Sequence, residues 1–166
     1  LNNEGIYRMS GVKSQVDALK ADFDADAQAV DLSTNDNAAD INAVTGTLKV
    51  FFRDLADGVI PRSDYDDVLN AAQEGNVAFV DERLQDLPPG NKETFRFIAQ
   101  HLRKVVDNAQ ENKMSAANIG VVLGPSLFSC KHVDAPGADM QEEEIARLSK
   151  QRALLTMIVE NATLGM

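Results

Sequence analysis

The sequence has 166 residues, of which 44% are hydrophobic, and carries a formal net charge of −10. This length fits a single domain over residues 1–166 with a sizeable core, and the acidic balance argues against a protein that binds nucleic acid or anionic membranes. No run approaches the roughly 18 apolar residues of a membrane helix, and Cys130, the single cysteine, cannot form an internal disulfide. We therefore expect a cytoplasmic domain and, because the sequence lacks a starting Met, one excised from a longer chain.

The first feature in chain order is a short loop, residues 4–11, in which Gly5 and Gly11 bracket the cation Arg8. Glycine tolerates positive φ and close backbone approach, so the pattern predicts a shaped loop that holds a guanidinium away from a scaffold. Taken alone, an arginine in such a turn is more often an ordinary solvated charge. We refer to residues 4–11 as the Arg8 loop.

Apolar residues at helical spacing predict the elements that follow. Residues 22–40 are acidic and poor in large apolar side chains, which indicates a long connection. No segment has the alternating period of a strand, so the fold class is all-α, a single helical bundle of about seven helices. The expected helices span residues 12–23, 40–55, 63–73, 77–87, 91–111, 116–128 and 140–164. Ser63 is the expected N-cap of the third helix. The last helix is expected to face the core with Ile145, Leu148, Leu155, Ile158, Val159 and Ala162.

The helix predicted at residues 40–55 carries two cations, Lys49 and Arg53, one turn apart and away from its apolar face. The alternative interpretation is a solvated face on which Arg53 pairs with a nearby Asp. The apolar face is expected to consist of Ile41, Val44, Leu48, Phe51, Phe52 and Leu55.

The two helices predicted next to each other at residues 91–111 and 116–128 carry the remaining polar candidates. His101 flanks an apolar stripe and is expected to be a packed, hydrogen-bonded residue, since no metal spacing accompanies it. Ser115 is the expected N-cap of the second helix, and Pro125 should break or kink it. Asn118 lies nearly two turns before Pro125 and could by itself be an ordinary exposed amide.

Three separated motifs resemble one family, the RhoGAP domains. They read GIYRMSG at residues 5–11, LKVFFRDL at residues 48–55 and NKMSAANIGVVLGPSL at residues 112–127. The stretch between them, with Leu87, Pro88, Asn91, His101 and Leu102, also resembles the family. Each motif is modest by itself, but their order and separation are specific, and the resemblance covers nearly the whole chain.

The resemblance implies a GTPase activator for Rho-family small G proteins of the Rho, Rac or Cdc42 type in their GTP-bound form. Such a domain is not itself an enzyme, because it supplies a catalytic arginine in trans, and it needs no cofactor or metal. By this likeness Arg8 is the arginine finger. The resemblance assigns partner binding and loop bracing to Lys49, Arg53, Asn118 and Pro125, and loop shaping to Gly5, Ser10 and Gly11.

The sequence also departs from the family pattern. Only a few residues precede the Arg8 loop, so we expect the N-terminal helices of the usual domain to be missing. Leu55 is followed by Ala56 where the family often has Leu-Pro-Glu-Pro, and Ser126 stands where Asn is common. The alternative function is a catalytically inactive module of the same fold that only binds a small GTPase or acts as a scaffold. For either function we expect a monomer.

Overall fold

The computed structural model describes residues 1–129, 140–161 and 164–165, and every regular element in these ranges is a helix. The predicted all-α fold class is therefore confirmed. Cys130 and Ala162, the latter expected to face the core, lie outside the described residues. The elements are α1 (Lys13–Asp26), the 3₁₀ turn η1 (Asp36–Ala38), α2 (Ile41–Asp54), α3 (Arg62–Gln73), α4 (Val77–Gln85), α5 (Pro89–Asp107), α6 (Ala109–Asn112), α7 (Ala116–Leu127) and α8 (Met140–Glu160).

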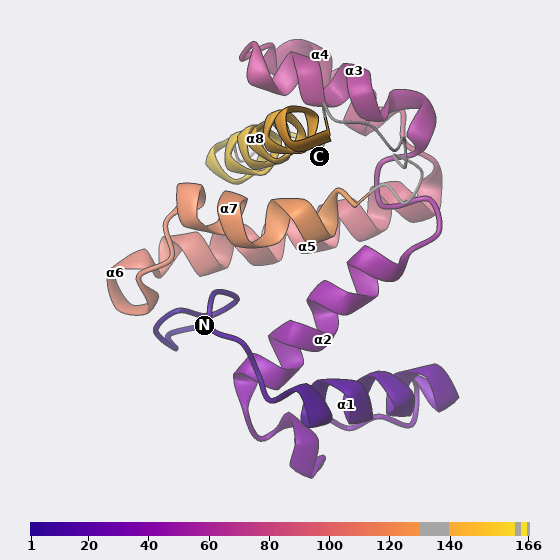
Figure 1. The fold of residues 1–166 in the computed structure, drawn as a ribbon, viewed down its shortest axis with the longest axis vertical. Helices are drawn as coiled ribbons and strands as arrows, with labels where there is room; N and C mark the ends of the chain where they lie inside the picture. Colours follow the sequence, from indigo (N-terminus) through magenta and orange to yellow (C-terminus); the bar gives the residue numbers. More distant parts are fainter. Residues whose placement is uncertain (130–139, 162–163, 166) are drawn as a thin grey trace.

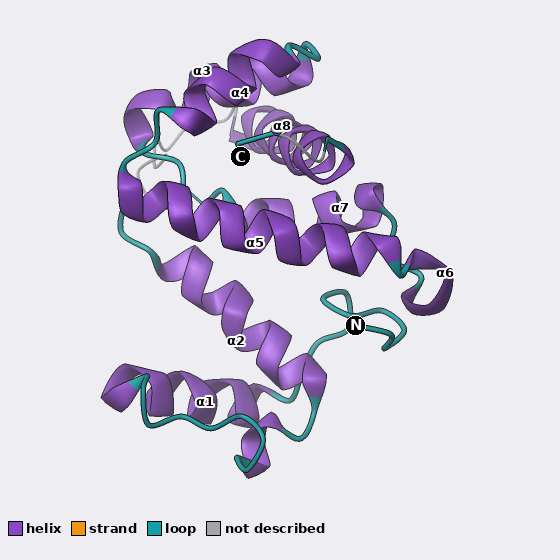
Figure 2. Cartoon of the chain, turned by 180° about the vertical axis from the view of Figure 1, so that it is seen from behind, coloured by secondary structure: helices purple, strands orange, loops and turns teal. Residues whose placement is uncertain are grey.

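The helices form a packed upper body and an arm that extends from it (Figure 1). In the body, α8 packs against α7 and α3, and α5 crosses beneath them. Helix α2 leads away from the body to α1 at the far end, as the reverse view also shows (Figure 2). The Arg8 loop lies between α2 and the α6–α7 corner, so the fold places this loop beside two separate helices.

The ends of the helices follow local capping chemistry, with one exception to the prediction. Asp40 accepts a hydrogen bond from the Asn42 N–H at 2.9 Å at the start of α2, and Ser115 caps α7 as expected. Ser63 is not the N-cap of α3, so that prediction was wrong. The helix begins at Arg62, because Pro61, with φ −58°, is preset for the approach to a helix and takes the N-cap position.

The segment predicted as one helix at residues 91–111 is two helices. Helix α5 ends at Asp107, where the side-chain amide of Asn108 donates to the Lys104 carbonyl at 2.7 Å. Helix α6 follows and ends at Asn112, and the next residue, Lys113, has a left-handed φ of 61° that turns the chain toward α7. Of the break or kink expected at Pro125, a break does not occur, because α7 continues through this residue to Leu127.

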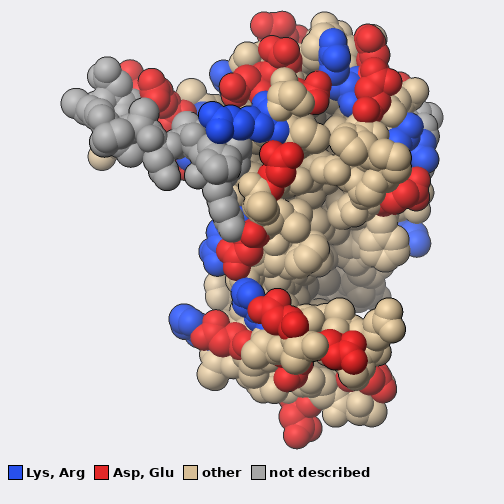
Figure 3. Space-filling model, turned by 90° about the vertical axis from the view of Figure 1, so that its right-hand side faces the viewer, with Lys and Arg blue, Asp and Glu red and all other residues tan. Residues whose placement is uncertain are grey.

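Two predicted core faces are only partly buried. On α2, Phe52 is buried but Phe51 is 53% exposed. Val44, Leu48 and Phe51 line two adjoining cavities of about 600 and 620 Å³. Figure 3 shows a hollow bordered mostly by uncharged atoms between the upper and lower parts of the molecule.

On α8, the expected inward residues Leu155, Ile158 and Val159 are buried. Ile145 and Leu148 are exposed, and this part of the prediction was wrong. The reason is that residues 141–146 are all exposed, so the first turns of the helix lie outside the packed core.

The contact between α7 and α8 depends on two small residues, Gly120 and Gly124. A Cβ atom at Gly120 would lie 2.6 Å from Thr156 Oγ1 and 2.9 Å from the Arg152 carbonyl oxygen. A Cβ at Gly124 would lie 3.0 Å from the Gln151 carbonyl oxygen. The two helices can approach this closely because glycine presents only hydrogen on that face.

We predict that Gly120→Ala lowers the free energy of unfolding by about 1–2 kcal/mol, measured by urea denaturation. In an open helix the same change would be favourable by about 1 kcal/mol, but here the methyl group meets backbone of α8, and overpacking costs about 1–3 kcal/mol. The matched control is Gly90→Ala in the first turn of α5, where a Cβ would meet nothing within 4 Å. A Gly120→Ala variant as stable as wild type would contradict the packing described for α7 and α8.

Candidate functional site

The Arg8 loop is a tight turn built on Gly5. The carbonyl oxygen of Gly5 accepts hydrogen bonds from the N–H groups of Arg8 at 2.8 Å and Met9 at 2.9 Å. Gly5 has φ +71°, and a Cβ there would lie 2.9 Å from Met9 Cγ, so both conformation and space favour glycine. Tyr7 also has a positive φ of 69°, in the left-handed region that side chains other than glycine seldom adopt.

A buried asparagine, Asn112, joins this loop to the end of α6. The N–H of Gly5 donates to the Asn112 carbonyl oxygen at 2.8 Å. The side-chain amide of Asn112 donates to the carbonyl oxygens of Leu1 at 3.0 Å and Val105 at 2.7 Å, and its Oδ1 accepts from the Met114 N–H at 2.8 Å. Every polar atom of this fully buried side chain is therefore paired, and the loop is fixed relative to α5 and α7.

Tyr7 connects the loop to α5 through its hydroxyl group. The Oη atom lies 2.6 Å from Nε2 of His101, and the two rings meet edge to face. Burial raises the pKa of Tyr7 to about 12. Burial, followed by the charges of Lys104 and the amino terminus, lowers the pKa of His101. The expectation that His101 is a packed, hydrogen-bonded residue is confirmed.

The two cations of α2 have different surroundings. Lys49 is half-buried and donates from Nζ to the Tyr7 carbonyl oxygen at 2.9 Å, and burial lowers its pKa. Arg53, one turn later, keeps 62% of its side chain exposed, and its Nε lies 3.9 Å from Asp54 Oδ1. Lys49 therefore touches the loop, whereas Arg53 faces solvent beside a single, distant carboxylate.

Arg8 is exposed, and its side chain forms no hydrogen bond or ion pair with any residue in the described ranges. A Cβ at Gly5 would lie 3.4 Å from Arg8 Nη2, so the guanidinium lies close over the Gly5 backbone. The loop thus carries a cation that has no partner within the part of the chain described.

The C-terminal end of the loop crosses the start of α2 at Gly11. A Cβ there would lie 2.5 Å from both Cα and N of Ala43, so only glycine allows this approach. Ser10 is exposed, and within the described residues its side chain makes no hydrogen bond.

The remaining predicted site residues lie on α7. Asn118 is exposed, and its amide donates to the Lys113 carbonyl oxygen at 3.0 Å, next to the segment that holds Gly5. Pro125 is half-buried near the other end of the helix. The structure therefore brings Gly5 close to Arg8, Lys49 to the neighbouring residue Tyr7, and Asn118 to Lys113 beside the residue that holds Gly5, while Arg53 and Pro125 lie farther along their helices.

Sequence reasoning did not assign a role at the site to Tyr7, His101 or Asn112. Tyr7 and Asn112 stand inside the recognised motifs, but nothing in the sequence shows that residue 5 bonds to residue 112 or residue 7 to residue 101.

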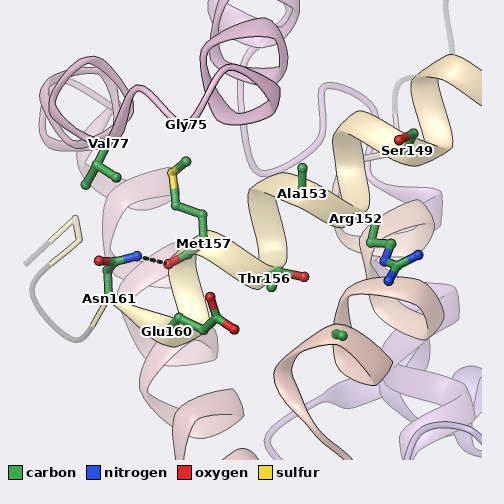
Figure 4. Close-up of a pocket in the computed structure, with 10 residues that line it drawn as sticks. Gly75, Val77, Ser149, Arg152, Ala153, Thr156, Met157, Glu160 and Asn161 are labelled. Carbon is green, nitrogen blue, oxygen red and sulfur yellow. Dashed lines mark hydrogen bonds between the residues drawn. The ribbon is translucent and has the colours of Figure 1, made fainter.

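A separate pocket of about 440 Å³ lies between the start of α4 and α8, away from the Arg8 loop. Gly75, Val77, Arg152, Thr156 and Glu160 are among its lining residues, and the Asn161 amide at its edge donates to the Met157 carbonyl oxygen at 2.7 Å (Figure 4). None of the predicted site residues lines it.

Two further properties of the described residues bear on the class of site. They contain no cluster of three or more His, Cys, Asp or Glu side chains placed to hold a metal ion. None of the helices in this part of the chain has the length and apolar character needed to cross a membrane.

Comparisons with known proteins agree on one class. The family model described as RhoGAP domain matches residues 1–132. The beta-chimaerin of Mus musculus is 35% identical over 168 residues, covering 97% of this chain and 48% of that protein. The active breakpoint cluster region-related protein of Xenopus laevis is 39% identical over 142 residues, covering 80% of this chain and 16% of that protein.

Solved structures give the same result. The structure of human Rho GTPase activating protein 15 superposes with a TM-score of 0.82 at 25% identity, covering 99% of this chain and 76% of that one. The BH domain from GRAF, the GTPase regulator associated with focal adhesion kinase, gives 0.77 at 26% identity, covering 96% of this chain and 82% of that one. The fold and the motifs thus define a small-GTPase regulatory domain, and the chain belongs to the RhoGAP family. It spans about half the length of the beta-chimaerins that it matches.

We predict that Asn112→Ala lowers the free energy of unfolding by about 2–3 kcal/mol, because it leaves the buried N–H of Met114 without its partner and removes the side-chain hydrogen bond to the Val105 carbonyl oxygen. It should also speed hydrogen exchange at the Gly5 amide, measured by NMR. The control is Asn108→Ala, which removes an exposed bond and should change stability by less than about 1 kcal/mol. Equal effects at the two positions would contradict the role given to Asn112.

Proposed function

We propose that this chain stimulates GTP hydrolysis by Rho-family small G proteins and that Arg8 is the catalytic arginine it supplies in trans. Membership of the family supports the class of activity. The observation that carries the assignment to Arg8 is its setting: an exposed guanidinium without a partner among the residues that the structure describes, on a loop held by Asn112, Lys49 and His101.

The chemistry of GTP hydrolysis explains why such a group accelerates the reaction. Negative charge builds on the phosphoryl oxygens and the β–γ bridge in the transition state, and a slow GTPase lacks enough positive charge there. An arginine supplied by the activator stabilises this charge and helps to hold the glutamine that orients the attacking water. Its contribution is about 10³–10⁵ in rate, or roughly 4–7 kcal/mol. The planar fork of Arg donates several hydrogen bonds in fixed geometry, which the single ammonium of Lys cannot do.

The proposed docking surface extends from the loop along α2 and α7 and consists of Met9, Arg53, Asn118 and Val121. Met9 and Val121 are apolar yet about half exposed, and Val121 follows Asn118 by three residues on the same face of α7. Arg53 offers an exposed guanidinium to an acidic residue of a switch region. Lys49, which donates to the loop backbone, acts in this proposal as a brace for Arg8 more than as a direct contact.

We predict that Arg8→Ala reduces GTP hydrolysis at saturating activator by about 10²-fold or more, measured in single-turnover assays on a Rho, Rac and Cdc42 panel. Affinity for a GTPase loaded with a non-hydrolysable GTP analogue should change by less than about threefold, because the arginine acts on transition-state charge.

The matched control is Lys13→Ala, an exposed cation paired with Asp17 at the start of α1. Equal stimulation by wild type and Arg8→Ala would refute the assignment. Tight binding with no stimulation by the wild type would select the alternative, an inactive GTPase-binding module.

For Arg53→Ala we expect a different signature, a loss of affinity of about tenfold with a saturated rate within about threefold of wild type. The reason is that Arg53 stands away from the loop and contributes to complex formation through charge, so the loss should shrink at high salt. Arg62→Ala, at the exposed start of α3, is the control for a lost surface charge. Unchanged affinity in Arg53→Ala would remove this residue from the docking surface.

A further inference from the structure

Tyr7 has a backbone conformation that requires an explanation. Its φ of 69° lies in the left-handed region, where the backbone strain of a residue other than glycine is of order 1–3 kcal/mol. This residue directly precedes Arg8, so its conformation decides the direction in which the arginine leaves the loop. Such a conformation persists only where the surrounding structure holds it.

The contacts around Tyr7 supply that restraint from two helices. The ring is 2% exposed, its hydroxyl lies 2.6 Å from His101 Nε2, and its carbonyl oxygen accepts from Lys49 Nζ at 2.9 Å. The ring centroids of Tyr7 and His101 are 5.9 Å apart with an interplanar angle of 77°. Backbone and side chain of the same residue are thus attached to α2 and α5 respectively.

His101 is well placed to act as the fixed end of this contact. Its neighbour Leu102 and, one turn earlier, Ile98 are buried, so this part of α5 belongs to the packed body. Burial lowers the pKa of His101 and raises that of Tyr7 to about 12, so near pH 7 the imidazole is neutral and can accept while the phenol keeps its proton and can donate.

We infer that His101 is a positioning residue for the proposed reaction, because its hydrogen bond to Tyr7 holds the left-handed turn from which Arg8 is presented. The inference rests on the proposed function and adds to it a residue on α5 that touches neither the GTPase nor the nucleotide. It also assigns a function to Tyr7 beyond filling the core.

Two variants test the contact with minimal change of shape. Tyr7→Phe removes only the hydroxyl, and His101→Phe removes the ring nitrogens while keeping an aromatic ring. Each should lower the saturated rate of stimulated hydrolysis by about 5- to 20-fold, with the half-saturating concentration changed by less than about twofold. The double variant should be no slower than either single one, because both remove the same hydrogen bond.

The control is Tyr65→Phe, which removes the other buried tyrosine hydroxyl, whose partners are the Phe128 carbonyl and Gln151. It should lower the midpoint of thermal unfolding and leave the saturated rate unchanged. A loss of rate in Tyr7→Phe that is fully accounted for by its unfolded fraction would overturn the positioning role.

A readout independent of activity separates this inference from the proposed function. Order parameters of the Tyr7 and Arg8 amides from ¹⁵N relaxation should indicate a rigid backbone in wild type, near 0.85, and fall below about 0.6 in Tyr7→Phe. Rigid loops and full rates in both variants would overturn the inference while leaving the proposed function intact. A wild type that stimulates no GTPase would overturn the proposed function, and the order parameters would then decide on the His101 contact alone.

Discussion

The position of the Arg8 loop depends on one buried side chain, the amide of Asn112. Its three side-chain hydrogen bonds join the first residue, the end of α5 and the start of α7, and its carbonyl oxygen holds the N–H of Gly5. Because a buried polar group without partners is costly, the loss of any one of these bonds would destabilise the corner. The loop is therefore part of the same rigid corner as α7, and Asn118 reaches that corner through Lys113.

The charges around this corner explain how a strongly acidic chain can present a site for an anionic reaction. The molecule carries a formal net charge of −10, so a site for phosphoryl charge must be local. Lys49 is half-buried and donates a hydrogen bond to the loop backbone. Arg8 and Arg53 are therefore the exposed cations of the proposed site. Arg8 has no ion pair with any other described residue that would have to be broken before it meets a developing negative charge, and a preorganised donor of this kind is effective in stabilising a transition state.

The sequence predicted the helices and the class of protein better than it predicted the contacts of the site. Periodicity located α2 and α7 to within a residue or two, because their apolar faces and the caps Asp40 and Ser115 are local signals. It misjudged Phe51 and Ile145, since the exposure of an apolar residue depends on whether another helix covers it, and that is a property of the whole fold.

For the site, too, the sequence predicted local features but not tertiary contacts. Glycines at positions 5 and 11 predicted a shaped loop, and the structure gives each a physical reason, a positive φ at Gly5 and a close backbone approach at Gly11. The contacts that brace the loop, Gly5 with Asn112 and Tyr7 with His101, join residues about a hundred positions apart. Such pairs are set by tertiary packing, so no local pattern could have identified Asn112 or His101 as part of the site.

The central claim is that Arg8 acts on the transition state of GTP hydrolysis and not on the ground-state complex. The most direct measurement compares affinity for a Rho-family GTPase in two states, bound to a non-hydrolysable GTP analogue and bound to GDP with aluminium fluoride, which mimics the phosphoryl group in transfer. Wild type should bind the second state at least about tenfold more tightly, and Arg8→Ala should lose that preference while keeping its affinity for the first. Equal affinities of the wild type for both states, or a preference that survives in Arg8→Ala, would contradict the account.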